Sequence, residues 1–139
     1  IKRYYEPDLQ IKLINHLLKL ANTSIDISDG LIDDLKKLIN RQKFSFHIFE
    51  KKIPVSKTLS QLIKIKKFKK INITTRGDDY QILFTASRFK SRIIKKISKI
   101  TGIKITKIGN IISGKNRSKI INLKDKQIEA KNKGYIHQF

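Results

Sequence analysis

A run of six residues, Asp26-Ile27-Ser28-Asp29-Gly30-Leu31, sets the strongest constraint on how this chain can fold. Residues 22–27 are rich in β-branched side chains, which favours a strand. Residues 31–40 carry leucine and isoleucine at the spacing of an amphipathic helix. The chain must therefore pass from a strand into a helix at this run, with two aspartates and a serine at the junction.

The carboxylates of this junction matter because acidic residues are scarce, with 11 against 32 basic residues. If Asp26 ends the strand and Ser28 caps the helix, Asp26 and Asp29 project near the positive end of the helix dipole. Magnesium often binds one or two carboxylates together with phosphate oxygens. Ser28 and the N–H groups of the first turn could then contact a phosphate, with Gly30 allowing its close approach. The alternative is an ordinary helix cap with a solvated acid.

Other acidic residues allow simpler interpretations. Asp33 and Asp34 fall in the first turns of the expected helix, where acids complement the helix dipole. Asp78 and Asp79 form a pair immediately before a strand-like segment. Adjacent carboxylates repel each other unless a cation or a donor lies between them. This second pair predicts either a plain turn or part of a ligand site.

The remaining sequence alternates between helical and strand-like segments. We predict helices at 8–20, 31–40, 56–65 and 87–100, the last of them ending at a Gly102 cap. We predict strands at 22–27, 43–53, 70–75, 80–85, 103–112 and 120–123, with a turn at 114–116 and a polar, irregular tail. Antiparallel pairing is expected around the turn. This pattern predicts an α+β fold with a mixed or antiparallel sheet and helices packed on one face.

Length and composition bound the class of protein. At 139 residues the chain is long enough for a single domain with a hydrophobic core. It contains no cysteine, which excludes disulfides and thiolate metal sites, and no stretch nears the roughly 20 apolar residues that cross a bilayer. These features predict a cytoplasmic protein without a membrane partner. Because the chain lacks methionine and begins at Ile1, we expect it to be part of a longer protein.

The formal net charge of +21 raises an alternative, a small basic module that binds RNA or another polyanion. The excess is mostly lysine, and lysine, isoleucine and asparagine all have A/T-rich codons, so base composition alone can produce this pattern. The candidate stacking aromatics lie on strand patterns that mostly serve cores. They are Phe44, Phe46, Tyr80 and Phe84. We therefore expect no nucleic-acid partner.

The two acidic motifs resemble, in the same order, motifs in the C-terminal domain of the thiamine-monophosphate kinases. Residues 26–31, followed by Asp34-Leu35, are similar to that family's Asp-Ile-Ser-Asp-Gly-Leu segment. Residues 77–85, Gly-Asp-Asp-Tyr-Gln-Ile-Leu-Phe-Thr, resemble its Gly-Glu-Asp-Tyr-Glu-Leu-Leu-Phe-Thr segment. Further similarities lie at 3–7, 108–111 and 134–139. The resemblance covers essentially the whole chain, and it implies the fold of the aminoimidazole ribonucleotide synthetase-like superfamily.

The resemblance implies a magnesium-dependent kinase that transfers the γ-phosphate of ATP to thiamine phosphate, giving thiamine diphosphate. It implies that Asp26 and Asp29 bind magnesium and that Ser28 contacts an ATP phosphate. Asp78 takes the position of a substrate-binding glutamate, although aspartate is one methylene shorter. Tyr135 would stack on or enclose the thiamine rings.

The resemblance also implies a missing partner. The family has an N-terminal domain that supplies most magnesium ligands, much of the ATP site and the dimer interface. Residues 1–139 would then be a single C-terminal domain that holds one wall of the active site. We accordingly expect a homodimer for the full-length protein and no catalysis by this chain alone, with a non-catalytic remnant as the alternative.

Overall fold

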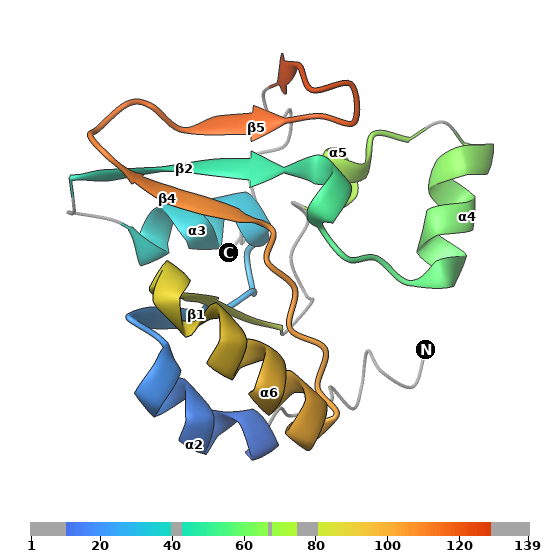
Figure 1. Ribbon diagram of the computed structural model, residues 1–139. Coiled ribbons are helices and arrows are strands. Elements are labelled where there is room, and N and C mark those ends of the chain that lie inside the picture. Colours follow the sequence, from blue (N-terminus) through green and yellow to red (C-terminus); the bar gives the residue numbers. More distant parts are fainter. Residues whose placement is uncertain (1–10, 40–42, 67, 75–80, 129–139) are drawn as a thin grey trace, which may run out of the picture.

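The computed structural model describes residues 11–39, 43–66, 68–74 and 81–128 (Figure 1). The helices are α2 (Ile11–Leu20), α3 (Leu31–Leu38), α4 (Lys57–Ile65), α5 (Lys70–Thr74) and α6 (Ser91–Thr101), with short 3-10 turns η1 (Glu50–Lys52) and η2 (Arg88–Lys90). The strands are β1 (Thr23–Asp26), β2 (Phe44–Phe49), β3 (Ile82–Thr85), β4 (Gly109–Ser113), β5 (Lys119–Ile121) and β6 (Gln127–Ile128). The predicted α+β class is confirmed, but the strands form two sheets.

The smaller sheet pairs β1 with β3 in antiparallel register, with Asp26 opposite Ile82 and Thr23 opposite Thr85. Its side chains alternate between two hydrophobic clusters. Leu83 packs towards the cluster around α3, whereas Ile82 and Phe84 pack towards the cluster between α2 and α6. Both faces of this sheet are therefore covered.

The larger sheet has the strand order β4-β2-β5-β6. Strand β2 runs antiparallel to β4 on one side and parallel to β5 on the other. The turn at 114–116 connects β4 to β5, but these two strands are not paired because β2 lies between them. The predicted antiparallel pairing around this turn is therefore wrong. Ser45 of β2 holds the connection between β4 and β5 in place. Its hydroxyl donates to the Gly114 carbonyl at 2.6 Å and accepts from the Arg117 N–H at 3.0 Å.

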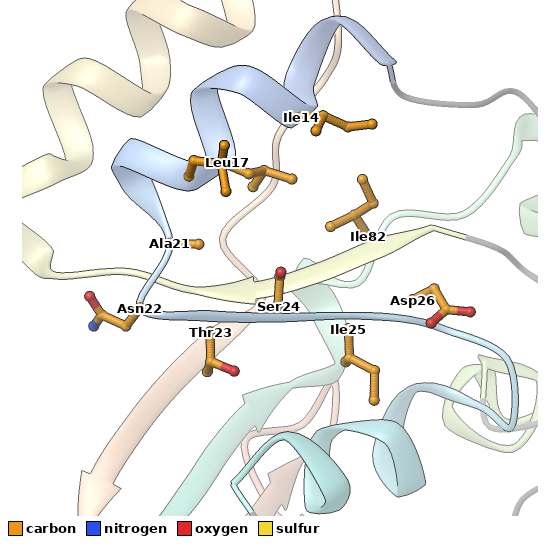
Figure 2. A pocket seen from close by; sticks show the side chains of 10 residues that line it. Ile14, Leu17, Ala21, Asn22, Thr23, Ser24, Ile25, Asp26 and Ile82 are labelled. Carbon is orange, nitrogen blue, oxygen red and sulfur yellow. The ribbon is translucent and has the colours of Figure 1, made fainter.

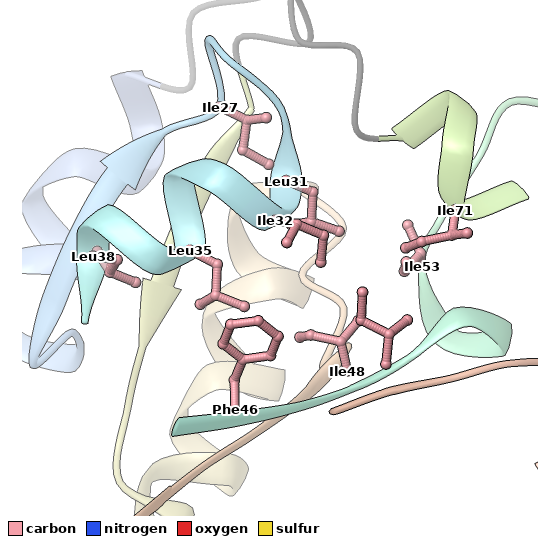
Figure 3. Packing of buried hydrophobic residues seen from close by; sticks show 10 residues of the cluster. Ile27, Leu31, Ile32, Leu35, Leu38, Phe46, Ile48, Ile53 and Ile71 are labelled. Atoms are coloured by element: carbon pink, nitrogen blue, oxygen red, sulfur yellow. The ribbon is translucent and has the colours of Figure 1, made fainter. Parts of the chain in front are cut away.

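The main core lies between α3 and the larger sheet (Figure 3). Leu31, Leu35 and Leu38 of α3 face Phe46 and Ile48 of β2 within one cluster of buried side chains. A second cluster joins α2 to α6 on the far side of the smaller sheet. Its buried members are Leu13, Leu17, Leu20 and Ile97. Helix α3 is thus held between two sheets, which fixes the loop that precedes it.

Residues 70–74, predicted as a strand, form helix α5 instead. Ile71 is completely buried, and its N–H donates to the Glu50 carboxylate at 3.0 Å. Glu50 is itself buried. Burial lowers the pKa of Lys70 from its usual value, against the opposing charge of Glu50. The local pattern of residues 70–74 favours a strand, but a contact between Ile71 and Glu50, 21 positions earlier in the chain, stabilises a helix instead.

Two further predictions differ from the structure. Residues 102–108 lie outside the strands, and β4 begins at Gly109, where a Cβ atom would meet the His47 carbonyl oxygen at 2.3 Å. Strand β6 lies in the tail expected to be irregular. Among the apolar side chains of η2 and α6, Ile97 is buried, whereas Phe89, Ile93 and Ile100 are exposed.

The predicted Gly102 cap is confirmed, since Gly102 ends α6 with a φ of 71°. Helix α4 has a side-chain cap from Ser56, which accepts the Leu59 N–H at 3.1 Å. Within the described residues, no helix is long and apolar enough to cross a membrane.

Candidate phosphate and metal site

The loop between β1 and α3 occupies residues 27–30. Gly30 precedes the first helical residue with a φ of 119° and a ψ of 150°, a conformation that essentially only glycine adopts. The glycine is therefore required by the path of the backbone. Ser28 was predicted to cap the helix, but the N-cap position belongs to Gly30, and Ser28 lies two residues before it.

The side chain of Asp34 holds the backbone of the loop that precedes α3. Its Oδ2 atom accepts three consecutive backbone N–H groups, from Ser28 at 2.9 Å, Asp29 at 2.9 Å and Gly30 at 3.1 Å. Asp34 is 0% exposed. The prediction that this residue only complements the helix dipole is therefore wrong.

Helical spacing contains a signal that identifies Asp34. The residue lies three positions after Leu31 and four before Leu38, both of which are buried. Asp34 thus shares the inward face of α3, and a carboxylate on that face must find donors. Asp33, its neighbour, is partly exposed and pairs with Lys36 at 2.9 Å, as expected for a surface acid.

Lys37 connects two of the aspartates. Its ammonium pairs with Asp29 Oδ2 and, at 2.9 Å, with Asp34 Oδ1. The hydrogen bond with Asp29, followed by that with Asp34, raises the pKa of Lys37 above its usual value. Asp29 keeps 27% of its side chain exposed, so its carboxylate is within reach of solvent.

Asp26 lies at the end of β1, where it lines an open hollow of about 530 Å³ (Figure 2). Helix α2 contributes apolar side chains to this hollow, including Ile14 and Leu17, and Ile82 comes from β3. Asp26 is exposed and supplies a carboxylate at one end. A molecule held in the hollow would therefore meet an apolar wall and an acidic group.

The structure places three of the five predicted site residues on a single connection. Asp26, Ser28 and Asp29 all lie between the end of β1 and the start of α3. Asp78 and Tyr135 lie outside the described residues.

The donor set fits magnesium, which prefers hard oxygen ligands and often takes only one or two from a protein. Asp26, at the end of β1, and Asp29, on the loop that follows, are accessible carboxylates. Among the described residues there is no group of three or more histidine, cysteine, aspartate or glutamate side chains arranged to hold a metal. A cation held by Asp26 and Asp29 would therefore need phosphate oxygens, water or other groups to complete its coordination sphere.

Replacing Lys37 with methionine removes an ammonium that competes with a cation for Asp29. We expect Mg²⁺ to bind about two- to fivefold more tightly to the variant, because an exposed ion pair of this kind contributes up to about 1 kcal/mol. Isothermal titration of Mg²⁺ measures the change. Lys36→Met is the matched control, since Lys36 pairs with Asp33 on the same helix. Lys37 also pairs with the buried Asp34, so amide exchange at residues 28–30 is measured in the same variant. Equal effects in both variants, or weaker Mg²⁺ binding to Lys37→Met with unchanged exchange at residues 28–30, would contradict the competition.

Comparison with known proteins identifies relatives over nearly the whole chain, although no protein-family model matches it. The thiamine-monophosphate kinase of Buchnera aphidicola subsp. Schizaphis graminum is 34% identical over 137 residues, which are 99% of this chain and 42% of that protein. The chain therefore spans about two fifths of the length of this relative.

Solved structures give the same result for the fold. The thiamine-monophosphate kinase from Stenotrophomonas maltophilia K279a has a TM-score of 0.71 and 26% identity, over 82% of this chain and 35% of that one. AaThiL complexed with AMPPCP and TMP has a TM-score of 0.72 and 27% identity, over 99% of this chain and 40% of that one. The resemblance that the motifs indicated is confirmed: the chain is related, in sequence and in fold, to a part of the thiamine-monophosphate kinases.

Proposed function

We propose that this chain forms part of an ATP-dependent kinase that transfers a phosphoryl group to thiamine phosphate, giving thiamine diphosphate. The observation that carries the proposal is the position of the Asp-Ile-Ser-Asp-Gly-Leu run on the β1–α3 connection, in a chain similar over 99% of its length to a thiamine-monophosphate kinase. The complex of AaThiL with AMPPCP, an analogue of ATP, and TMP supports both substrates.

In this proposal Asp26 and Asp29 bind Mg²⁺, and Ser28 contacts an ATP phosphate. Phosphoryl transfer depends mainly on positioning and on stabilising negative charge, and it does not require a covalent nucleophile in the protein. Bound magnesium would supply charge neutralisation for the phosphates. The chain's own contribution is to hold the exposed carboxylate of Asp26 at the end of β1, and the partly exposed carboxylate of Asp29 on a loop whose backbone is fixed by Gly30 and Asp34.

The residues that we expect to bind the acceptor substrate lie outside the described ranges. We propose that Asp78 and Tyr135 contact thiamine phosphate, as the family motifs imply. We further propose that the remaining magnesium ligands, much of the ATP site and a homodimer interface come from an N-terminal domain, and that the protein works in the cytoplasm. The 139-residue chain would then be inactive by itself.

The test is formation of thiamine diphosphate from thiamine phosphate and Mg-ATP. Two polypeptides are compared, the 139-residue chain and the product of the full upstream reading frame. We expect product from the longer polypeptide and none from the chain. Turnover by the chain alone would contradict the need for a second domain, and a folded longer polypeptide without product would contradict the kinase.

The alternative of an RNA-binding module loses one of its stacking candidates, because Phe46 is 3% exposed and packs in the core. Binding of RNA with a steep dependence on salt, and without sensitivity to Asp26→Asn, would favour that alternative.

A further inference from the structure

We propose that Asp34 is the positioning residue of the 28–30 loop, and that it occupies the backbone N–H groups which would otherwise bind phosphate. Ligand binding at this loop is thereby left to the side chains of Ser28 and Asp29 and to a cation. The identity of the ligand rests on the proposed function, whereas the role of Asp34 in the loop rests on the geometry alone.

The first step of the argument is the number of donors on one oxygen. Oδ2 of Asp34 accepts N–H groups from three consecutive residues at 2.9–3.1 Å, and all three precede the first helical residue of α3. A backbone conformation that aims three successive N–H groups at one point is an anion-binding concavity. In this protein the anion is part of the chain.

The second step is burial and charge. Asp34 is 0% exposed, so no external anion can replace its carboxylate without unfolding the start of α3. Its second oxygen, Oδ1, pairs with Lys37 at 2.9 Å. Both carboxylate oxygens therefore have charge-assisted or backbone donors, as a buried carboxylate requires.

The third step concerns an incoming phosphate. The N–H groups of residues 28–30 already donate at normal distances, so they have no hydrogen available for a phosphate oxygen. Asp26 and Asp29 add two further carboxylates on the same connection, and these repel an anion. Phosphate recognition through the N–H groups of residues 28–30 is therefore replaced by recognition through a cation.

Amide hydrogen exchange on the chain tests the positioning role. In Asp34→Asn the side chain keeps its shape but loses its charge, and we expect the amides of residues 28–30 to exchange about tenfold or more faster. This factor corresponds to the loss of charge-assisted hydrogen bonds. Amides in α2 and β2 should change much less. Asp33→Asn is the matched control, because Asp33 is the adjacent acid and pairs with Lys36 on the surface.

The second part of the proposal is that the N–H groups of residues 28–30 are not free to bind phosphate. Titration of the wild-type chain with inorganic phosphate, followed by NMR, tests it without any variant. We expect no saturable shift of the amides of residues 28–30 with phosphate alone. Mg-AMPPCP is then titrated into the full-length protein, as wild type and as Asp34→Asn. We expect about 10- to 100-fold weaker binding to the variant, the usual cost of losing a group that orients a metal ligand.

The outcomes separate the two proposals. Equal exchange in Asp34→Asn and Asp33→Asn, or unchanged Mg-AMPPCP affinity despite faster exchange at residues 28–30, overturns the positioning role. Saturable binding of phosphate alone to the amides of residues 28–30 would show that Asp34 does not occupy these N–H groups, and it overturns that part of the proposal. If the full-length wild-type protein does not bind Mg-AMPPCP, the proposed function fails, while the exchange and phosphate results on the chain still decide the role of Asp34. If Asp34→Asn does not fold, slow exchange of residues 28–30 in wild type supports the role and fast exchange overturns it.

Discussion

Replacing Asp26 with asparagine is expected to abolish most thiamine diphosphate formation by the full-length protein. The substitution keeps the shape of an exposed side chain at the end of β1 and removes only its charge. Loss of a group that merely supports a metal ligand already costs about 10- to 100-fold, so loss of a ligand is expected to cost about 100-fold or more in turnover at fixed Mg²⁺. Steady-state kinetics over a range of Mg²⁺ concentrations measure the effect.

The matched control for this substitution is Asp125→Asn. Asp125 is an exposed carboxylate that pairs with Lys51 at 3.0 Å, far along the chain from the β1–α3 loop. Both variants lose one negative charge on the surface, and both should unfold within about 0.5 kcal/mol of wild type. Turnover of Asp26→Asn within a few-fold of Asp125→Asn would show that Asp26 is not a metal ligand.

Replacing Leu35 with alanine is expected to lower the free energy of unfolding by about 2–5 kcal/mol. Leu35 is 2% exposed in the centre of the main cluster, between α3 and β2 (Figure 3). The cost combines the lost transfer free energy of the side chain with the cavity that remains. Because single domains are stable by only about 5–15 kcal/mol, this change removes a large part of the total. Urea denaturation followed by circular dichroism measures it.

Leu18→Ala makes the same chemical change on a helix but at a surface position, since Leu18 is 83% exposed. Alanine has a high helix propensity, so this control should stay within about 0.5 kcal/mol of wild type. A loss of similar size in both variants would mean that Leu35 does not lie in a packed core.

The spacing of apolar residues predicts a helix or strand correctly where the buried face of that element follows the same spacing. The helical spacing of residues 31–40 gave α3, and the strand-like residues 80–85 gave β3. Residues 70–74 were misassigned because their β-branched pattern is overridden by the buried contact between Glu50 and Ile71. Long-range contacts of this kind leave no signal in a short window of sequence.

In the candidate site, too, features set by neighbouring residues could be predicted, and features set by packing could not. The positions of Asp26, Ser28 and Asp29 at a strand-to-helix junction followed from the sequence, because the junction is defined by neighbouring residues. The role of Asp34 in holding this loop does not follow from the sequence pattern, because the two adjacent acids, Asp33 and Asp34, look equivalent within the first turns. Only the face of α3 that each one occupies distinguishes them, and that face is set by packing against β2.

Strand β2 lies inside the larger sheet, between β4 and β5, so it cannot complete its pairing early in synthesis of the chain. Both neighbours of β2 lie late in the chain, at 109–113 and 119–121, about 60 residues or more after β2 ends. At the usual pace of translation, about 5–20 residues per second, a ribosome needs several seconds to supply them. During that interval the edges of β2 lack their native partners, and such edges favour pairing with other chains. Assembly of the larger sheet is therefore expected to finish only after most of this chain has been synthesised.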